Sequence, residues 1–171
     1  MIRRALLAVG LTGLVAISGA GAVSANAPAT HFRAQLTGAQ EVPPTGSEAT
    51  GTLDLRLTDN GTRLRFRLDA DGVSRIIQSH IHIGAPGTNG PVVVFFFAPT
   101  PNTADKAVTG DGFEVKGVRT AADFALSTGV TFAAFLADLR AGNTYVNVHS
   151  PAHPGGEIRG QIRPAGEDGE D

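Results

Sequence analysis

The chain is 171 residues long and carries 14 lysines and arginines, 16 aspartates and glutamates, a formal net charge of −2 and no cysteine. This balance, without a basic stretch interleaved with aromatic residues, argues against a nucleic-acid partner. The length suits a single domain that buries roughly two-thirds of its unfolded surface. Because no disulfide can form, the fold has to be stabilised by its core or by a metal ion.

Residues 1–27 are typical of a secretory signal peptide, with two arginines, then the apolar segment 5–17, then small residues. That segment is short for a bilayer span. We expect cleavage after Ala27, with Ala25 as the alternative, and a secreted or envelope-associated protein without a membrane span. An uncleaved membrane anchor is the competing interpretation.

Apolar and polar residues alternate in the next part of the chain, which is the period of a half-buried strand. This pattern predicts strands within residues 31–36, 50–57 and 63–70. Asn60-Gly61 tolerates positive φ, which predicts a tight hairpin joining Leu53–Leu57 to Leu64–Leu68. The loop before that hairpin contains Pro43-Pro44, which blocks a ladder there.

The second half continues in the same period. Strands are predicted within residues 76–83, 92–97, 113–119, 144–150 and 157–163, with a surface loop over 100–112. Every residue from Val92 to Phe97 is apolar, which indicates an interior strand covered on both faces.

A single helix is predicted from the spacing i, i+3, i+4, i+7 of Phe132, Phe135, Leu136 and Leu139, with Gly142 closing it. About eight short strands and one short crossover helix predict an all-β fold, an antiparallel Greek-key sandwich or barrel. Alternating helices are missing, which disfavours a parallel α/β fold. Residues 165–171 are expected to form an acidic, disordered tail.

The segment "SHIHIGAPGTNGP" places two histidines one residue apart. On a strand, His80 and His82 point to one face with Cβ atoms about 6.5 Å apart. Ile81 and Ile83 then face the core, so the histidine face is either solvated or shared with a neighbouring element. In "TYVNVHS" the same alternation turns His149 outward, where it would supply a third nitrogen if the two strand ends meet.

His153 follows in a bent loop and is a candidate fourth ligand. Imidazoles without thiolates suit Cu(II) or Zn(II). A His-x-His pair is also common as plain surface polarity, and His31 is interpreted in that way, as an exposed residue of the first strand.

Other candidate residues receive structural interpretations. Ser79 and Ser150 face away from their neighbouring histidines, so neither forms a serine–histidine pair with that neighbour. Polar residues that alternate with Ile158 and Ile162 are expected on the solvated face of the last strand, namely Glu157, Arg159, Gln161 and Arg163. The pairs Asp69 with Asp71 and Asp54 with Asp59 are interpreted as turn residues.

Three segments resemble successive blocks of the CHRD domain, the repeat first described in chordin: "FRAQLTGAQEVPPTGSEATGT", "HIHIGAPGTNGPVVV" and "AGNTYVNVHSPAHPGGEIRGQI". The resemblance covers Phe32 to Arg163 and is most specific in the third block. It implies an extracytoplasmic β domain, assigned here to residues 28–164, and no defined biochemical activity.

The order of the histidines is also similar to that in the Greek-key barrel of copper/zinc superoxide dismutase. By that resemblance His80, His82 and His149 occupy the copper positions. No histidine lies between His82 and His149 to bridge to zinc, and the disulfide cysteines are absent. The resemblance therefore extends only to a copper site, and likeness of fold does not confer dismutation.

Three functional hypotheses follow. The first is a secreted or envelope-associated binding module that holds copper or zinc for structural or sequestering purposes. The second is a copper-dependent oxidoreductase of the dismutase type, which the missing zinc ligands and disulfide argue against. The third is a domain whose histidine-bearing loops contact an extracellular protein or glycan without a metal.

Overall fold

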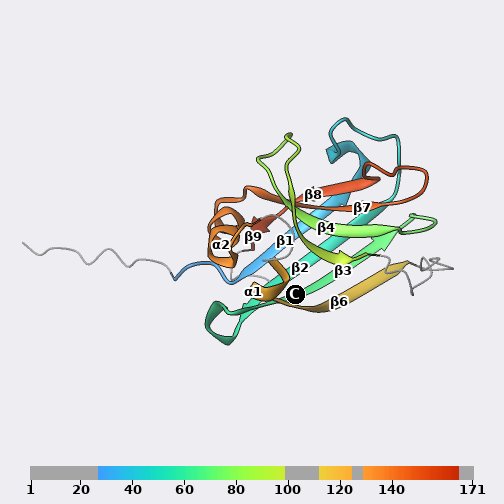
Figure 1. The fold of residues 1–171 in the computed structure, drawn as a ribbon. Coiled ribbons are helices and arrows are strands. Elements are labelled where there is room, and N and C mark those ends of the chain that lie inside the picture. Colours follow the sequence, from blue (N-terminus) through green and yellow to red (C-terminus); the bar gives the residue numbers. More distant parts are fainter. Residues whose placement is uncertain (1–26, 99–111, 125–128, 166–171) are drawn as a thin grey trace, which may run out of the picture.

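The computed structural model describes residues 27–98, 112–124 and 129–165 (Figure 1). Its strands are β1 His31–Thr37, β2 Thr50–Thr58, β3 Arg63–Asp71, β4 Gln78–Ile83, β5 Val92–Phe97, β6 Phe113–Thr120, β7 Thr144–His149, β8 Ile158–Gln161 and β9 Arg163–Pro164. The helices are α1 Ala121–Phe124 and α2 Phe132–Ala141, with the 3-10 turns η1 Gly38–Gln40 and η2 Asp59–Gly61. The expected signal peptide, the 100–112 loop and the acidic tail lie outside the described residues, apart from one boundary residue each.

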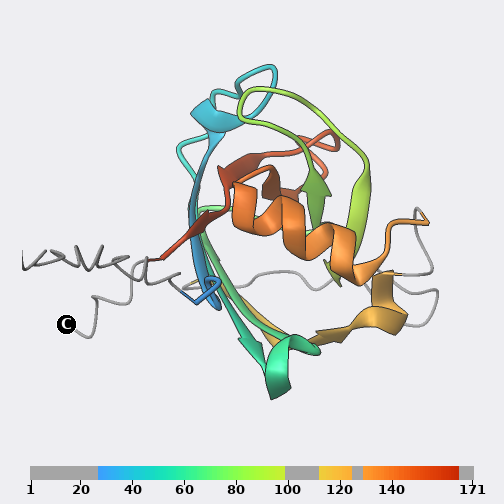
Figure 2. The ribbon, with the colours of Figure 1, turned by 90° about the vertical axis from the view of Figure 1, so that its left-hand side faces the viewer.

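The strands form one antiparallel sheet in the order β5-β4-β7-β8-β1-β2-β3-β6, with β9 paired to β1. The sheet curls into a nearly closed barrel, and α2 lies over one end of it (Figure 2). Neighbours such as β3 with β6 and β4 with β7 are not consecutive in sequence, as Greek-key connections require. The predicted all-β Greek-key class is confirmed.

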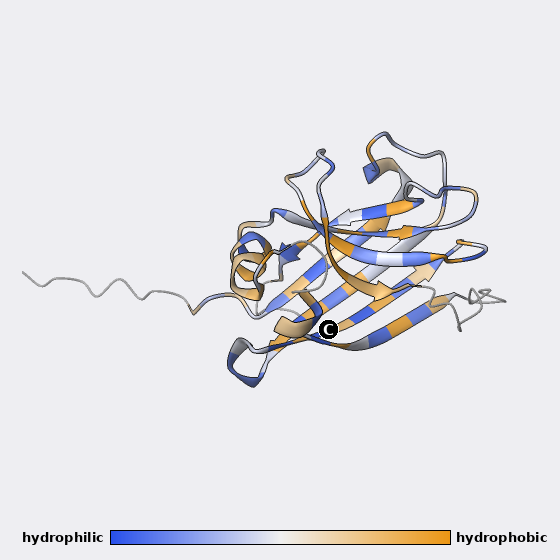
Figure 3. Cartoon of the chain, viewed as in Figure 1, coloured by the Kyte–Doolittle hydropathy of each residue, from blue (hydrophilic) through white to orange (hydrophobic). Residues whose placement is uncertain are grey.

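The barrel interior follows from the period-two pattern. Along β1, β2 and β3 the apolar residues are buried and the residues between them are exposed or half-buried. Figure 3 shows this alternation as orange and blue bands across the same strands. The expected hairpin between β2 and β3 is present, with Leu57 opposite Leu64 and positive φ at Asp59, Asn60 and Gly61.

Helix α2 closes one end of the core. The side chain of Thr131 accepts a hydrogen bond from the Ala134 N–H at its start, and Gly142 ends it with φ 73°. Phe135 and Leu139 are fully buried on its inner face. The predicted helix and its glycine terminator are therefore both present, whereas the four-residue α1 was not predicted.

The prediction that Val92–Phe97 is an interior strand is wrong. The path of paired strands ends at β5 and at β6, so β5 is an edge strand, and its Phe95 is 38% exposed. Arg119 of β6 spans the gap, donating from Nε to the Phe95 carbonyl at 2.7 Å and from Nη2 to the Phe96 carbonyl at 3.1 Å. An apolar run shows that a strand is largely covered, but not which neighbour covers it.

The interpretation of the aspartates as turn residues holds only for Asp59. Asp54, Asp69 and Asp71 lie within β2 and β3, where their side chains face outward and contact arginines or stay exposed. Solvent on that face of the sheet satisfies the carboxylates, so a strand accommodates them there.

Candidate metal centre

Three histidines meet on one face of the β4–β7 pair. The antiparallel register sets Gln78 opposite His149, His80 opposite Asn147 and His82 opposite Tyr145. Because side chains alternate along a strand, His80, His82 and His149 project to the same side. One ligand atom from each histidine lies within 4.8 Å of the others.

This face of the sheet is covered rather than solvated. The exposed fractions are 3% for His80, 9% for His82 and 5% for His149. Two loops provide the cover, because the His82 Nδ1–H donates to the Gly90 carbonyl at 2.7 Å and the His149 Nδ1–H donates to the Pro154 carbonyl at 2.9 Å. The sequence left open whether this face is solvated or is shared with a neighbouring element. The second alternative is correct.

The loop carbonyls also determine which ring nitrogens are available. A carbonyl only accepts, so Nδ1 carries the proton in His82 and His149, and Nε2 of each neutral ring presents a lone pair. His149 Nε2 and His80 Nδ1 are buried and have no hydrogen-bond partner in the described part of the chain. A buried acceptor without a partner is unfavourable by about 1–3 kcal/mol, and a metal ion would satisfy both atoms.

The third ligand atom has a polar neighbour. His82 Nε2 lies 3.2 Å from the side-chain oxygen of Asn147. Asn147 also forms a hydrogen bond with Glu41, which links His82 to that carboxylate. An ion bound at His82 Nε2 would replace the contact with Asn147.

Burial keeps all three rings neutral. Desolvation, with the neighbouring His149 and His82, lowers the pKa of His80 from 6.5 to about 3. Desolvation is also the main reason that the pKa values of His82 and His149 are lowered. Neutral imidazole is the form that coordinates a metal, so the site does not have to lose a proton at neutral pH.

Aromatic and cationic side chains support the cluster from one side. Tyr145 stacks on His82 with ring centroids 4.5 Å apart and planes inclined by 6°. The guanidinium of Arg159 lies 3.3 Å from the centre of the Tyr145 ring and donates to the Thr88 carbonyl at 2.7 Å. The stack fixes the orientation of His82 and ties it to the loop that ends near Gly90.

The expectation of a solvated face on the last strand is wrong for two residues. Arg159 is 1% exposed and Glu157 is 7% exposed. Ser47 donates to a Glu157 carboxylate oxygen at 2.8 Å, and Arg159 donates to the loop carrying Thr88 and Asn89. The polar alternation was real, but loops from distant parts of the chain cover that face.

Glu41 belongs to the surroundings of the site and was not predicted. It is 6% exposed, and its Oε1 has no hydrogen-bond partner among the described residues. Burial raises the pKa of Glu41, although Arg159 and a hydrogen bond with Asn147 act against that change. The sequence around Glu41 reads only as a proline-containing loop, so no local signal pointed to it.

The remaining predicted residues take other positions. His153 is half-buried in the loop after β7 and is not one of the three residues whose ligand atoms gather. His31 is half-buried on β1, where its Nε2 lies 2.6 Å from Asp54, rather than fully exposed as expected. No hydrogen bond between a serine hydroxyl and a histidine ring occurs within the described ranges.

An antiparallel Greek-key barrel with a buried group of three histidines defines the class of this protein. Within that class the sequence comparison is specific, because the family model of the CHRD domain matches residues 32–162. The chain belongs to the CHRD domain family. No curated protein matched the chain. In the part of the chain that is described, no helix has the length and apolar character needed to cross a membrane.

Proposed function

We propose that this protein is an exported CHRD-domain module that binds one divalent ion, Cu(II) or Zn(II), through His80, His82 and His149. The observation that supports this most strongly is the convergence of three buried imidazoles, with ligand atoms within 4.8 Å, from two strands far apart in sequence. His80 Nδ1 and His149 Nε2 are buried and have no hydrogen-bond partner among the described residues. Plain surface polarity does not explain buried, unpaired nitrogens.

The donor set matches the proposed ions. Imidazole nitrogens suit copper and zinc, and the chain has no cysteine that would favour a softer ion. Metal–nitrogen bonds of about 2.0–2.1 Å at tetrahedral angles place two ligand nitrogens about 3.4 Å apart. Ligand atoms that are up to 4.8 Å apart therefore need to approach by up to about 1.4 Å, which side-chain rotation can supply.

Export is part of the proposal. We assign residues 1–27 to a cleaved signal peptide, residues 28–164 to the domain and residues 165–171 to an acidic tail. The basic, apolar and small-residue order at the start supports the first assignment. Mass spectrometry of the protein from the culture medium or envelope should give a first residue of Pro28, or Asn26 for the alternative cleavage.

The direct test is metal analysis of protein purified without a polyhistidine tag, followed by calorimetric titration with Cu(II) and Zn(II). We expect one ion per chain. Stoichiometry near zero for both ions would exclude a metal site and leave an extracellular protein or glycan as the partner of these loops.

Single substitutions locate the ion. His82→Ala should weaken binding at least about a hundredfold, because it removes one of three ligands. His31→Ala is the matched control and should leave affinity within about twofold, since His31 lies on β1 against Asp54. Equal weakening by the two variants would contradict the assignment.

His153 is tested in the same series. His153 is not one of the three residues whose ligand atoms gather, so a fourth nitrogen from it would require its side chain to change position. If three histidines suffice, His153→Ala binds the ion as tightly as the unmodified protein. A loss comparable to that of His82→Ala would add His153 to the ligands.

A binding role fits better than a copper-dependent dismutase-type oxidoreductase. None of the three histidines is more than 9% exposed, whereas a reacting metal needs an open coordination position. Superoxide decay with the copper-loaded protein should be no faster than with matched free copper. A rate well above that control would favour the enzyme.

A further inference from the structure

The outward face of β1, β2, β3 and β6 is mostly cationic at one end and acidic at the other. One end holds six exposed cationic side chains, Arg33, Arg56, Arg63, Arg65, Arg67 and Lys116. The other end holds the carboxylates Asp69, Asp71 and Glu114. This surface, called here the arginine face, lies on different strands from the histidine cluster.

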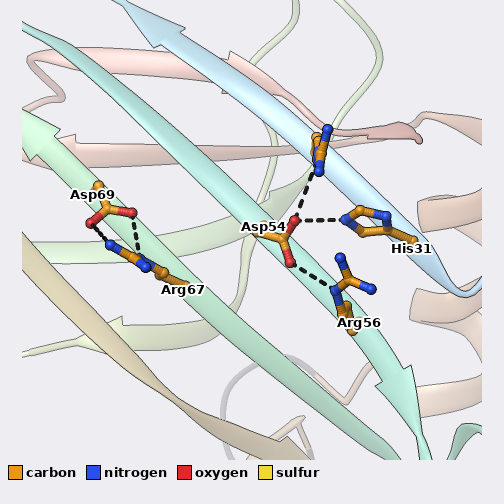
Figure 4. A network of polar contacts seen from close by, with 6 residues as sticks. His31, Asp54, Arg56, Arg67 and Asp69 are labelled. Atoms are coloured by element: carbon orange, nitrogen blue, oxygen red, sulfur yellow. Dashed lines mark hydrogen bonds and ion pairs between the residues drawn. The ribbon is translucent and has the colours of Figure 1, made fainter. Parts of the chain in front are cut away.

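Arg63 is paired with Asp59 at 3.5 Å, and Arg67 and Lys116 are paired with Glu114 at 2.8 and 2.9 Å. Arg33 and Arg56 instead share one carboxylate. Asp54 contacts Nε of Arg33 and Nε of Arg56, each at 3.4 Å, and His31 at 2.6 Å. Figure 4 shows Asp54 between His31 and Arg56, with Arg67 turned instead toward Asp69. The terminal nitrogens of Arg33 and Arg56 have no partner in the ranges that the structure covers, so they remain available to bind an anion.

Two cations face each other without a carboxylate between them. The register sets Arg56 of β2 directly opposite Arg65 of β3. Like charges directly opposite each other destabilise a sheet. Arg65 forms no ion pair with any described residue, so an external anion held between the two guanidinium groups would relieve the repulsion.

A hollow of about 250 Å³ lies next to Arg33 on the same face, lined by Arg33, Ala34, Gln35, Thr52, Leu53 and Asp54. The outward side chains of Gln35 and Thr52 are exposed and face each other across β1 and β2. Amide, hydroxyl and carboxylate groups next to guanidinium groups can bind both the hydroxyls and the acidic group of a sugar ring.

The types of side chain on the arginine face favour some anionic partners over others. Among the described residues, Phe95 on β5 is the large apolar side chain that is exposed. The arginine face therefore has no large apolar side chain that could insert into a bilayer. The outward residues of β1, β2 and β3 include no Phe, Tyr or Trp on which nucleic-acid bases could stack. We propose that the arginine face binds an acidic polysaccharide, with carboxylate or sulfate groups held by Arg56 and Arg65. This proposal is independent of the metal site.

The test measures binding of the exported protein to labelled polygalacturonate and to dextran sulfate, with neutral dextran and phosphatidylglycerol vesicles as comparisons. At least one acidic polymer should bind, and its affinity should fall at least about tenfold as salt rises from about 50 to 200 mM. Neutral dextran should not bind, and vesicles should bind more weakly.

Charge variants locate the binding surface. Arg65→Glu should weaken binding about tenfold, whereas Arg75→Glu makes the same change in net charge in the loop between β3 and β4 and should change affinity less than about twofold. Asp54→Asn should strengthen binding, because it removes the carboxylate that competes for Arg33 and Arg56. His82→Ala should have no effect on polymer binding.

Three outcomes would overturn the proposal. They are no binding of either acidic polymer, equal losses for Arg65→Glu and Arg75→Glu, and tighter binding to the vesicles than to the polysaccharides. Failure of metal binding with normal polymer binding would leave this inference standing and would count only against the histidine site.

Discussion

At the scale of single residues, the histidines of the site are part of the packed structure. His82 stacks on Tyr145, donates to the Gly90 carbonyl and contacts Asn147. A solvated histidine could be replaced at little cost to the metal-free protein. The buried position changes that expectation, because removal leaves a cavity and an unpaired carbonyl.

His82→Ala should lower the free energy of unfolding of the metal-free protein by about 2–3 kcal/mol. Urea denaturation in the presence of a chelator measures this change. The His153→Ala control, which alters a half-buried loop residue, should cost less than about 1 kcal/mol. A loss below about 0.5 kcal/mol for His82→Ala would indicate that the ring is not packed as described.

Asp54 gives a prediction on pH at the same scale. Burial acts to raise its pKa, but the hydrogen bond from His31 and the nearby arginines hold it below the usual 3.8. Because the folded pKa is the lower one, the unfolded chain binds more protons in this range. The stabilisation by the carboxylate is therefore complete above about pH 4 and is lost as the pH falls further.

Asp54→Asn should thus cost less than about 1 kcal/mol at pH 6, since the side chain is 36% exposed. The difference from the unmodified protein should shrink toward zero between about pH 4 and pH 2. Chemical denaturation at several pH values measures it. A difference that grows on acidification would contradict the sign of the pKa change.

At the scale of elements, the contact between the two edge strands closes the barrel. Besides its two hydrogen bonds to β5, Arg119 lies 4.9 Å from the centre of the Phe66 ring, and Phe66 stacks on Phe96 at 4.0 Å. These contacts join β3, β5 and β6 although β5 and β6 share no ladder. A side chain therefore replaces backbone pairing at this position.

Arg119→Ala should destabilise the protein by about 1–2 kcal/mol, because two strand carbonyls of β5, one exposed and one half-buried, lose a charged donor. Hydrogen exchange should increase in β5 more than in β1, which lies in the middle of the sheet. Arg67→Ala, on the outward face of β3, is the matched control and should cost less than about 1 kcal/mol. Equal costs would contradict a closing role for Arg119.

The elements themselves were predictable from local sequence. Alternation indicated the strands, Asn60-Gly61 indicated a hairpin and Gly142 indicated the end of a helix, because each depends on neighbouring residues. The position of β5 at the edge was missed, since strand order depends on contacts between segments far apart in the chain. The same limit explains why the burial of Arg159 and Glu157 was missed.

At the scale of the whole molecule, the histidine site depends on which strands pair in the sheet. His80 and His82 are adjacent to His149 only because β4 and β7 pair across a long separation in sequence. Strand alternation predicted that the three histidine side chains project to the same side. Alternation could not predict Glu41, whose loop comes from the other half of the barrel, or the loops that supply the Gly90 and Pro154 carbonyls.

A crystal structure of the copper-loaded protein, with anomalous diffraction at the copper edge, would locate the ion itself. We expect one strong peak per chain, bound by His80 Nδ1, His82 Nε2 and His149 Nε2, with the Nδ1–H groups of His82 and His149 still donating to the loop carbonyls. A peak beside His31 or His153 instead, or no peak between β4 and β7, would contradict this expectation.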